Sequence, residues 1–453
     1  MSQHFARVAT YFLLLIASLP SLSGQQITGS ITGTVKDEQG GIVTTALVEA
    51  TNVDTGLSRA AHINNDGSYL IQYLAVGSYT VKVTAAGFKN FLQQNVVVTV
   101  DQILTLNVTL LVGAQTETVV VSDAPPLVNT SSAVLGRMVQ REEIIGLPLV
   151  NRNAYTEISL TPGVQTNSAS VSSNPAGTPN FVIGLPSTDV VINGGIDGGT
   201  PTVSFYLDGG INLTGQRNYG NSLPNPDALQ EFRVETSNYS AEYGRMSGAV
   251  VTAVTRSGTN RFHGSLFEFV RNTAFNATPW NATVNAPYHR NQFGGAVGGP
   301  IKRDKAFFFF SYGGLRQSVG TFLSGGVVPT ALERSGNFSA SKLLPVDPSS
   351  GKPYDYNGVP GWIPPSALDP TAANIISKYI PLPNSSNNAW TGFFTGPTTE
   401  NEYLGKYDQV LSEKDHISVS YFNIHLRQNA YGSWEHPLVD QSILCSTAES
   451  KRE

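Results

Sequence analysis

The 453-residue chain contains one cysteine, Cys445, which excludes an internal disulfide framework and any metal site built from several cysteines. Charged residues make up only 13% of the chain, about half the share of roughly 25% that is usual in globular proteins. Acidic residues outnumber basic ones by 33 to 28, giving a net charge of −5. There is therefore no basic field for nucleic acid, and we expect no nucleic-acid partner.

The chain also lacks an apolar run of the length, about 18 residues or more, that a transmembrane helix requires. The longest apolar stretch, Val8 to Leu19, follows Arg7 and has the length of a signal-peptide core. Small residues at Ser21 to Ser23 fit a cleavage site after Ser23 or Gly24, so residues 1–23 are predicted to be a signal peptide. The mature protein is then exported, and any membrane insertion has to be as a β-barrel.

The usual catalytic motifs are absent as well. None of the seven histidines has a glutamate at the His-x-x-Glu spacing, and there is no His-Glu-x-x-His, Gly-Lys-Ser/Thr loop or Gly-x-Ser-x-Gly. No catalytic residue, cofactor or metal site is predicted. A secreted metallopeptidase fails for want of a ligand set, and the chain is expected not to be an enzyme.

What the chain does have is glycine, 44 residues of it, and short alternating runs rich in valine and threonine. In residues 28–112 such runs are separated by turns at Glu38 to Gly41, at Asp66-Gly67 and at Gly77. About seven short strands at this spacing favour a β-sandwich, and the whole chain is predicted to be mainly β.

One stretch of this region, DGSYLIQYLAVGSYTVKVTAAGF, resembles the carboxypeptidase regulatory-like domain. The resemblance implies a transthyretin-like, carbohydrate-binding-like β-sandwich over residues 28–112. The zinc-binding pair of the carboxypeptidases that carry this module is missing here, so the resemblance implies the fold and not the peptidase activity.

Residues 115–128 contain a short strand-prone run, which Pro125-Pro126 closes. One interpretation is a last strand with a proline-rich linker. The other is an exposed segment that adds as a strand to the sheet edge of a partner. The run resembles the TonB box of outer-membrane TonB-dependent receptors. This implies that a TonB-type energy-transducing protein binds it from the periplasmic side, through Glu117, Thr118, Val119, Val120, Val121 and Ser122.

Residues 129–257 mix short strands with one or two helical pieces, one of them after Pro226. The elements LPLVNRN, TPGV, YLDGG, ALQEFRV, AEYGRMSGAVVTAVTRSGTN and FHGSLFEFVRN occur in one order along the chain. Together they resemble the plug domain, and the start of the barrel, of the Oar-like subgroup of TonB-dependent receptors. The resemblance implies an α+β plug over 129–257, with Ser257 to Asn260 as the hinge to the barrel wall.

Residues 258–453 are predicted to form the first strands, about five, of an incomplete transmembrane β-barrel. The connections between these strands run long, short, long, short, as a barrel that starts outward from a plug requires. A soluble β-sandwich stays open as an alternative, because its loops need not keep this order. The five predicted strands span residues 261–271, 290–301, 306–316, 401–411 and from 416 to 421.

Alternation within these strands divides the side chains between two faces. Glu268, Lys406 and Asp408 are expected to face the lumen and the plug. The run Phe307 to Phe310 does not alternate and is expected to need apolar cover on both faces, one of them from the plug. The residues expected to face outer-membrane lipid are Phe267, Phe269, Tyr403, Tyr407, Ile417, Val419 and Tyr421.

The predicted function is a TonB-dependent outer-membrane receptor or transporter that moves a ligand across the outer membrane. The alternative is a secreted or surface-exposed adhesin or glycan-binding β-protein. The extracellular ligand is unknown, with glycans, peptides and metal chelates all possible, and import and export both stay open. Receptors of this kind use about 22 strands, so the five predicted here suggest a truncated or frameshifted fragment.

Overall fold

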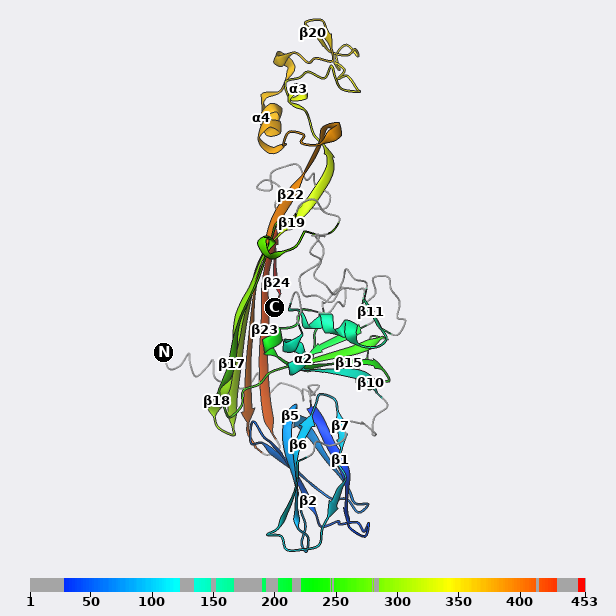
Figure 1. The fold of residues 1–453 in the computed structure, drawn as a ribbon, viewed down its shortest axis with the longest axis vertical. Helices are drawn as coiled ribbons and strands as arrows, with labels where there is room; N and C mark the ends of the chain where they lie inside the picture. Colours follow the sequence, from blue (N-terminus) through cyan, green and yellow to red (C-terminus); the bar gives the residue numbers. More distant parts are fainter. Residues whose placement is uncertain are drawn as a thin grey trace, which may run out of the picture.

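The computed structural model is elongated, with a sandwich at one end, a tall sheet beside a smaller mixed domain in the middle, and a small subdomain at the other end (Figure 1). The residues it describes are 28–122, 134–147, 152–166, 190–192, 203–213, 221–244, 246, 248–278, 280, 285–412, 415–429 and 447–452. The expected signal peptide lies outside them. No helix in these ranges is long and apolar enough to cross a membrane.

The N-terminal part is a sandwich of two sheets, one ordered β4-β1-β7 with β8 also paired to β1, and the other ordered β3-β2-β5-β6-β9. Inward side chains alternate with outward ones along β1, where Ile31 and Val35 are fully buried. This alternation produces the apolar core that the sequence predicted. The strands are β1 (Thr28–Asp37), β2 (Leu47–Asn52), β3 (Ser58–His62), β4 (Ser68–Ala75), β5 (Gly77–Thr84), β6 (Asn90–Val98), β7 (Ile103–Thr105), β8 (Val108–Leu110) and β9 (Thr118–Val121).

The middle domain is a five-stranded sheet in the order β10-β15-β16-β13-β14, with short helical pieces beside it. Every residue of β16 is buried, because this strand has neighbours on both edges and side-chain cover on both faces. Its elements are β10 (Leu135–Gln140), α2 (Arg141–Gly146), η1 (Ala154–Leu160), β11 (Val164–Thr166), β12 (Val190–Ile192), β13 (Val203–Leu207), β14 (Gly210–Ile211), η2 (Pro226–Ala228), β15 (Leu229–Ser237) and β16 (Ala249–Thr255).

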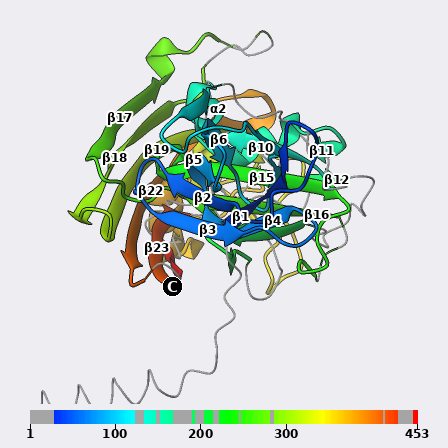
Figure 2. The same ribbon diagram turned by 90° about the horizontal axis from the view of Figure 1, so that it is seen from below.

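The tall sheet contains six antiparallel strands in chain order, one more than the sequence predicted. It is open rather than closed on itself, and it curves beside the middle domain when seen from below (Figure 2). The strands are β17 (His263–Asn272), β18 (Tyr288–Lys302), β19 (Ala306–Val327), β22 (Ala389–Val410), β23 (His416–Asn429) and β24 (Thr447–Arg452).

Two of these strands are far longer than expected. β19 and β22 have 22 residues each and stay paired nearly throughout, from Ala306 with Gln409 to Val327 with Ala389. Beyond the sheet they form a ribbon that carries the small subdomain (Figure 1). That subdomain contains α3 (Ala331–Arg334), β20 (Asp355–Tyr356), β21 (Val359–Pro360), η4 (Pro365–Ala367), α4 (Pro370–Tyr379) and η5 (Ser386–Asn388), and η3 (Thr273–Phe275) lies in the connection after β17.

Candidate functional site

The middle domain meets the tall sheet along one face of the strands, which we call the inner face. Across four neighbouring strands of this face, Phe267, Gly294, Gly313 and Glu402 stand in one row. A Cβ added at Gly294 would lie 2.8 Å from the ring of Phe267, and one at Gly313 only 2.3 Å from Oε1 of Glu402. The two glycines therefore leave the room in which Phe267 and Glu402 lie flat across the sheet.

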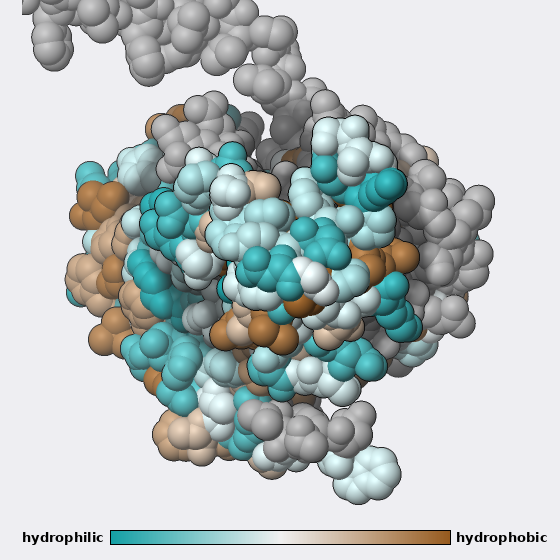
Figure 3. Space-filling model, turned by 90° about the horizontal axis from the view of Figure 1, so that it is seen from above, coloured by the Kyte–Doolittle hydropathy of each residue, from teal (hydrophilic) through white to brown (hydrophobic). Residues whose placement is uncertain are grey.

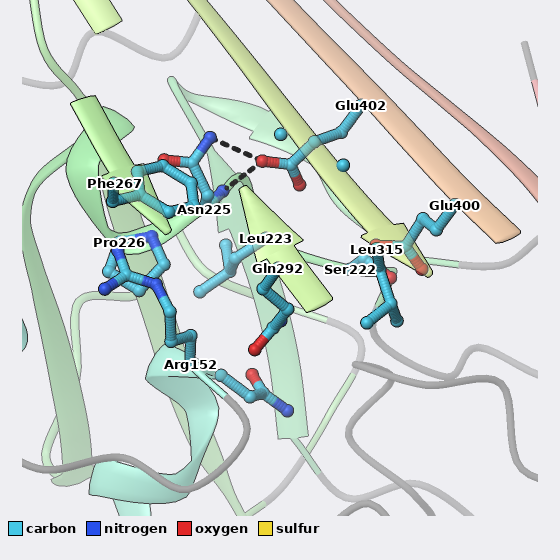
Figure 4. A pocket seen from close by; sticks show the side chains of 13 residues that line it. Arg152, Ser222, Leu223, Asn225, Pro226, Phe267, Gln292, Leu315, Glu400 and Glu402 are labelled. Carbon is cyan, nitrogen blue, oxygen red and sulfur yellow. Dashed lines mark hydrogen bonds between the residues drawn. The ribbon is translucent and has the colours of Figure 1, made fainter. Parts of the chain in front are cut away.

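Glu402 binds the loop that precedes η2 (Figure 4). Its Oε1 accepts a hydrogen bond from the backbone N–H of Asn225 at 2.9 Å and another from the side-chain amide of the same residue. That amide also donates to Oγ of Ser311 at 2.8 Å. Glu402 is only 8% exposed, and a buried carboxylate is costly unless hydrogen bonds satisfy it. This contact therefore fixes the loop to β19 and β22.

Asp227 is a second point of attachment. Its carboxylate forms an ion pair with Arg152 and accepts a hydrogen bond from Oγ of Ser265 on β17 at 2.7 Å. The guanidinium of Arg152 lies over the rings of Phe267 and Phe269, at 4.4 and 4.3 Å from their centroids. Stacking over aromatic faces and pairing with a carboxylate are both interactions that suit a planar guanidinium.

These contacts correct the prediction of which β17 side chains face inward and which face outward. Phe267 and Phe269 lie on the inner face beneath Arg152, and not on the outer face where lipid was expected. Glu268 alternates with them and lies on the outer face, where Leu266 is 92% exposed. The reason is that Arg152 and Asp227 of the middle domain attract the aromatic rings and the hydroxyl of this strand.

Lys406 makes a third attachment, from β22 to the end of β16. Its Nζ lies 3.5 Å from Oδ1 of Asp208 and donates to the backbone oxygen of Thr255 at 3.3 Å. Asp208 in turn accepts a hydrogen bond from the backbone N–H of Thr255 at 2.9 Å. Lys406 and Asp408 are 8% and 6% exposed, so both occupy the inner face that the sequence predicted for them.

The outer face of β22 and β23 is apolar and exposed. Tyr407 pairs with Val419, and these two residues are 40% and 57% exposed. Tyr403, Ile417 and Tyr421 share this face and are 42%, 47% and 66% exposed. From above, apolar colours gather along the left edge of the molecule, where Figure 1 places β17 and β18 (Figure 3). That these five side chains contact lipid stays a prediction.

The phenylalanine run of β19 divides between the two faces. Phe307 and Phe309 are each 1% exposed, whereas Phe310 is 45% exposed. Phe309 packs with Ala228 of the middle domain, and the guanidinium of Arg256 lies 5.3 Å from its ring centroid. The expected cover from the plug is thus present on the inner face at Phe309.

Two cavities lie between the middle domain and the sheet. The smaller, about 60 Å³, contains Glu402 and Arg152 (Figure 4). The larger, about 440 Å³, lies between α2 and the ends of β17 and β18, and its ionisable lining residues are arginines. The described residues that line it are Ile144, Ile145, Gly146, Leu147, Arg152, Pro226, Phe269, Val270, Arg271, Arg290 and Gln292. Such a lining is suited to a ligand with both an anionic and an apolar part.

A turn of the sandwich, at Val100 and Asp101, contacts the middle domain. Oε1 of Glu231 accepts a hydrogen bond from the N–H of Val100 at 2.6 Å, and Arg233 donates to the oxygen of Val100 at 2.9 Å. The hydroxyl of Tyr243 donates to Oδ2 of Asp101 at 2.7 Å. Burial raises the pKa of Glu231 to about 7 and also raises the pKa of Asp101. No sequence pattern predicted this junction, because Val100 takes part only through its backbone and the partner of Asp101 lies more than a hundred residues away.

The coupling segment, Glu117 to Ser122, forms an edge strand of the sandwich. Its central part is β9, which pairs in parallel with β6 over four residues, from Asn90 with Thr118 to Gln93 with Val121. Thr118 and Val120 are exposed, and Val119 and Val121 are half-buried. Its binding to a partner stays a prediction, but its position agrees with the interpretation as a last strand before a linker.

Metal ligands do not gather in the part of the chain that the structure describes. No group of three or more His, Cys, Asp or Glu side chains there could hold a metal ion. The residues that the sequence did not single out are instead Arg152, Asn225 and Asp227, which join the middle domain to the tall sheet. Two of them could have been noticed in the sequence. Asn225 and Asp227 lie on either side of Pro226, a proline that starts a helical turn.

Comparisons with known proteins match two parts of the chain, the N-terminal sandwich and the tall sheet with its connections. Residues 30–111 match the carboxypeptidase regulatory-like domain, and residues 254–449 match an outer membrane beta barrel domain. The TonB-dependent transporter Oar of Myxococcus xanthus is 27% identical over 307 residues, which cover 62% of this chain and 26% of that protein. The chain therefore spans about a quarter of the length of this curated relative.

Among solved structures, the outer membrane transporter YddB of Escherichia coli superposes with a TM-score of 0.40 at 11% identity, covering 65% of this chain and 33% of that one. A mutant of the ferric enterobactin receptor of Pseudomonas aeruginosa gives a TM-score of 0.36 at 11% identity, covering 68% and 35%. Oar itself is a transporter rather than an enzyme. The chain is a homologue of the TonB-dependent transporter Oar that combines a carboxypeptidase regulatory-like domain with an outer membrane β-barrel domain, and its location is the outer membrane.

Proposed function

We propose that the chain is the plug-bearing part of a TonB-dependent outer-membrane transporter. The observation that carries this proposal is the interface between the middle domain and the inner face of the sheet. Ion pairs and hydrogen bonds centred on Glu402, Asp227 and Lys406 hold it together, while the opposite face of β22 and β23 exposes tyrosine, valine and isoleucine side chains. An apolar outside with a polar inside is the pattern of an outer-membrane barrel. Residues 129–257 then act as the plug, and 258–453 as part of the wall.

A polar interface also suits a plug that moves. Each buried hydrogen bond or ion pair has discrete partners, so these contacts break one by one and re-form with water or with a ligand. No bond of the ligand is made or broken in this role, and the protein is not an enzyme. Energy enters through the coupling segment, Glu117 to Ser122, which binds a strand of a TonB-type protein in the periplasm.

The cavity of about 440 Å³ supports a proposal for the ligand class. Arg271 and Arg290 face each other on β17 and β18, and Arg152 reaches the same space from the plug. Guanidinium groups recognise carboxylates and phosphates through paired donors. Ile145 and Leu147 offer apolar contact in the same cavity. Among glycans, peptides and chelates, this favours a ligand that carries an anionic group beside an apolar one.

The test of the coupling role is a binding measurement with the purified periplasmic domain of the host's TonB-type protein. Val120→Pro removes a backbone donor and prevents extended pairing, whereas Val120→Thr keeps the shape and the strand preference of the residue. In detergent micelles, the wild type and V120T should bind the domain, and V120P should lose at least about ten-fold in affinity, because strand pairing depends on the backbone. Equal binding by V120P and V120T would refute the coupling assignment.

A further inference from the structure

β9 belongs to the sandwich sheet without contributing to the sandwich core. The buried cluster of that domain includes side chains of β6, such as Val96 and Val98, but none of β9. Val120 is 52% exposed, and Val119 and Val121 are only half-buried. Because no core side chain has to leave its place, β9 can detach while the remaining strands of the sandwich stay folded.

Besides its short backbone pairing with β6, β9 is held by side-chain contacts to its flanking residues, and these contacts are polar and lie at the surface. Nζ of Lys89 lies 2.6 Å from Oε2 of Glu117, with side-chain exposures of 32% and 59%. The side-chain amide of Asn90 donates to the oxygen of Gln115 at 2.6 Å, and that of Asn95 donates to the oxygen of Ser122 at 3.1 Å. Exposed contacts of this kind are individually weak, so the strand is held by a small, reversible set of interactions.

While it is docked, β9 offers little to a second strand. In a parallel pair, successive residues direct their backbone groups to opposite edges, so two of the four paired residues of β9 point away from β6. Two residues make a very short ladder. Once released, the segment from Glu117 to Ser122 has both strand edges free and can pair along its whole length.

We propose that the edge of β6 is an intramolecular dock that competes with the TonB-type partner for the segment Glu117 to Ser122. This inference rests on the proposed coupling function and adds its regulation. The partner binds only the released segment, so its apparent affinity falls by the fraction of molecules in which β9 is docked. Anything that loosens β9 from β6 strengthens partner binding, and anything that fixes it there blocks binding.

Variants on β6 test the first half of this statement without altering the partner's binding sequence. Lys89→Ala and Asn90→Ala each remove one contact to the docked segment, and each should raise the affinity for the periplasmic domain of the TonB-type protein by about three- to ten-fold. Lys82→Ala is the matched control, since Lys82 lies exposed on β5, which β6 separates from β9. Unchanged affinity in both dock variants would overturn the proposal.

A disulfide tests the second half. Leu92 and Val120 are register partners on β6 and β9, and the Cα atoms of such partners lie about 5 Å apart, within the range a disulfide spans. In a Leu92→Cys, Val120→Cys chain with Cys445→Ser, the reduced form should bind the periplasmic domain. The oxidised form should lose about a hundred-fold or more, because fixing the dock removes the competent state.

The two forms of this variant separate the two proposals. If the reduced form binds and the oxidised form does not, both stand. If both forms bind equally well, the dock proposal fails while the coupling function survives, since the partner then adds to the free edge of β9. If neither the reduced form nor the wild type binds, the coupling function fails and the dock proposal falls with it.

Discussion

Two strands of nearly the same composition have opposite places in this molecule. β9 reads TVVV and β16 reads AVVTAVT. All seven residues of β16 are buried at the centre of the plug sheet, between β15 and β13. β9 is an edge strand with two exposed residues and no side chain in a core. Valine and threonine favour strands, and both segments form one. Only β16 contributes side chains to the core of a domain.

The difference lies in the neighbours. β16 also ends at Thr255, where Lys406 of the wall and Asp208 of the plug meet its backbone and hydroxyl. β9 is held by Lys89, Asn90 and Asn95 at the surface. β16 is thus enclosed by neighbours on every side, whereas β9, the strand proposed to bind a partner, has a neighbour on one edge and a few exposed side-chain contacts.

The largest loss of stability should come from removing the cation of Lys406 at the end of β16. Lys406→Met keeps the length of the side chain but leaves Asp208 buried without its cation, which should cost roughly 3–5 kcal/mol of stability. Urea unfolding of the detergent-solubilised protein measures it. The double variant Lys406→Met, Asp208→Asn should recover much of the loss. If the single variant were as stable as the wild type, the pair of Lys406 and Asp208 would not stabilise the end of β16.

A second prediction compares the contribution of one valine in β16 with that of one valine in β9. Val251→Ala in the buried β16 removes two methyl groups from the plug core and should lower the free energy of unfolding by roughly 1.5–3 kcal/mol. The same titration with urea reports it. A loss below about 0.5 kcal/mol, the size usual at surfaces, would mean that β16 is not the packed centre of the plug.

A third test concerns pH and the strand beside β16. Burial raises the pKa of Glu231 from its ordinary 4.5 to about 7. Between these two values the unfolded chain has released the proton while the folded protein still holds it, so stability should fall as pH rises from 4.5 towards 7 and then level off. Glu231→Gln keeps an acceptor for the N–H of Val100 and should flatten this slope.

Thermal unfolding of wild type and E231Q at several pH values measures the difference. A wild type that gains stability relative to E231Q over this range would show that the carboxylate form is favoured at the junction, contrary to its burial.

The smallest effect on stability is expected in β9. Val120→Ala there should change the free energy of unfolding by less than about 0.5 kcal/mol, because the side chain is exposed. The pair V251A and V120A is therefore a matched comparison of one substitution in two strands. A loss at Val120 as large as that at Val251 would show that β9 is part of the folded core.

Much of this fold was predictable from local patterns. The sandwich, the mainly β architecture, the helical turn after Pro226 and the hairpins around Lys302 to Lys305 follow from alternation and turn residues. Alternation also placed Lys406 and Asp408 on one face and Tyr403 and Tyr407 on the other. These predictions succeed because a period of two is a property of the strand itself.

Other features depend on residues far away in the sequence. Alternation in β17 separates Phe267 from Glu268 but does not say which face is inner, and Arg152, more than a hundred residues earlier, makes that choice. The extension of β19 and β22 to 22 residues depends on their pairing with each other. The docking of β9 on β6 likewise has no local signature, because any valine-rich strand has two edges on which to pair.

The most direct test of the account is hydrogen exchange of the backbone amides of β9 and β16 in the same sample. We expect the amides of Thr118 to Val121 to exchange at least about a hundred-fold faster than those of Ala249 to Thr255, because β9 opens without unfolding the sandwich core. Adding the periplasmic domain of the TonB-type protein should then protect β9 and leave β16 unchanged. If β9 is protected as strongly as β16 before any partner is added, the coupling strand is not detachable and the account is contradicted.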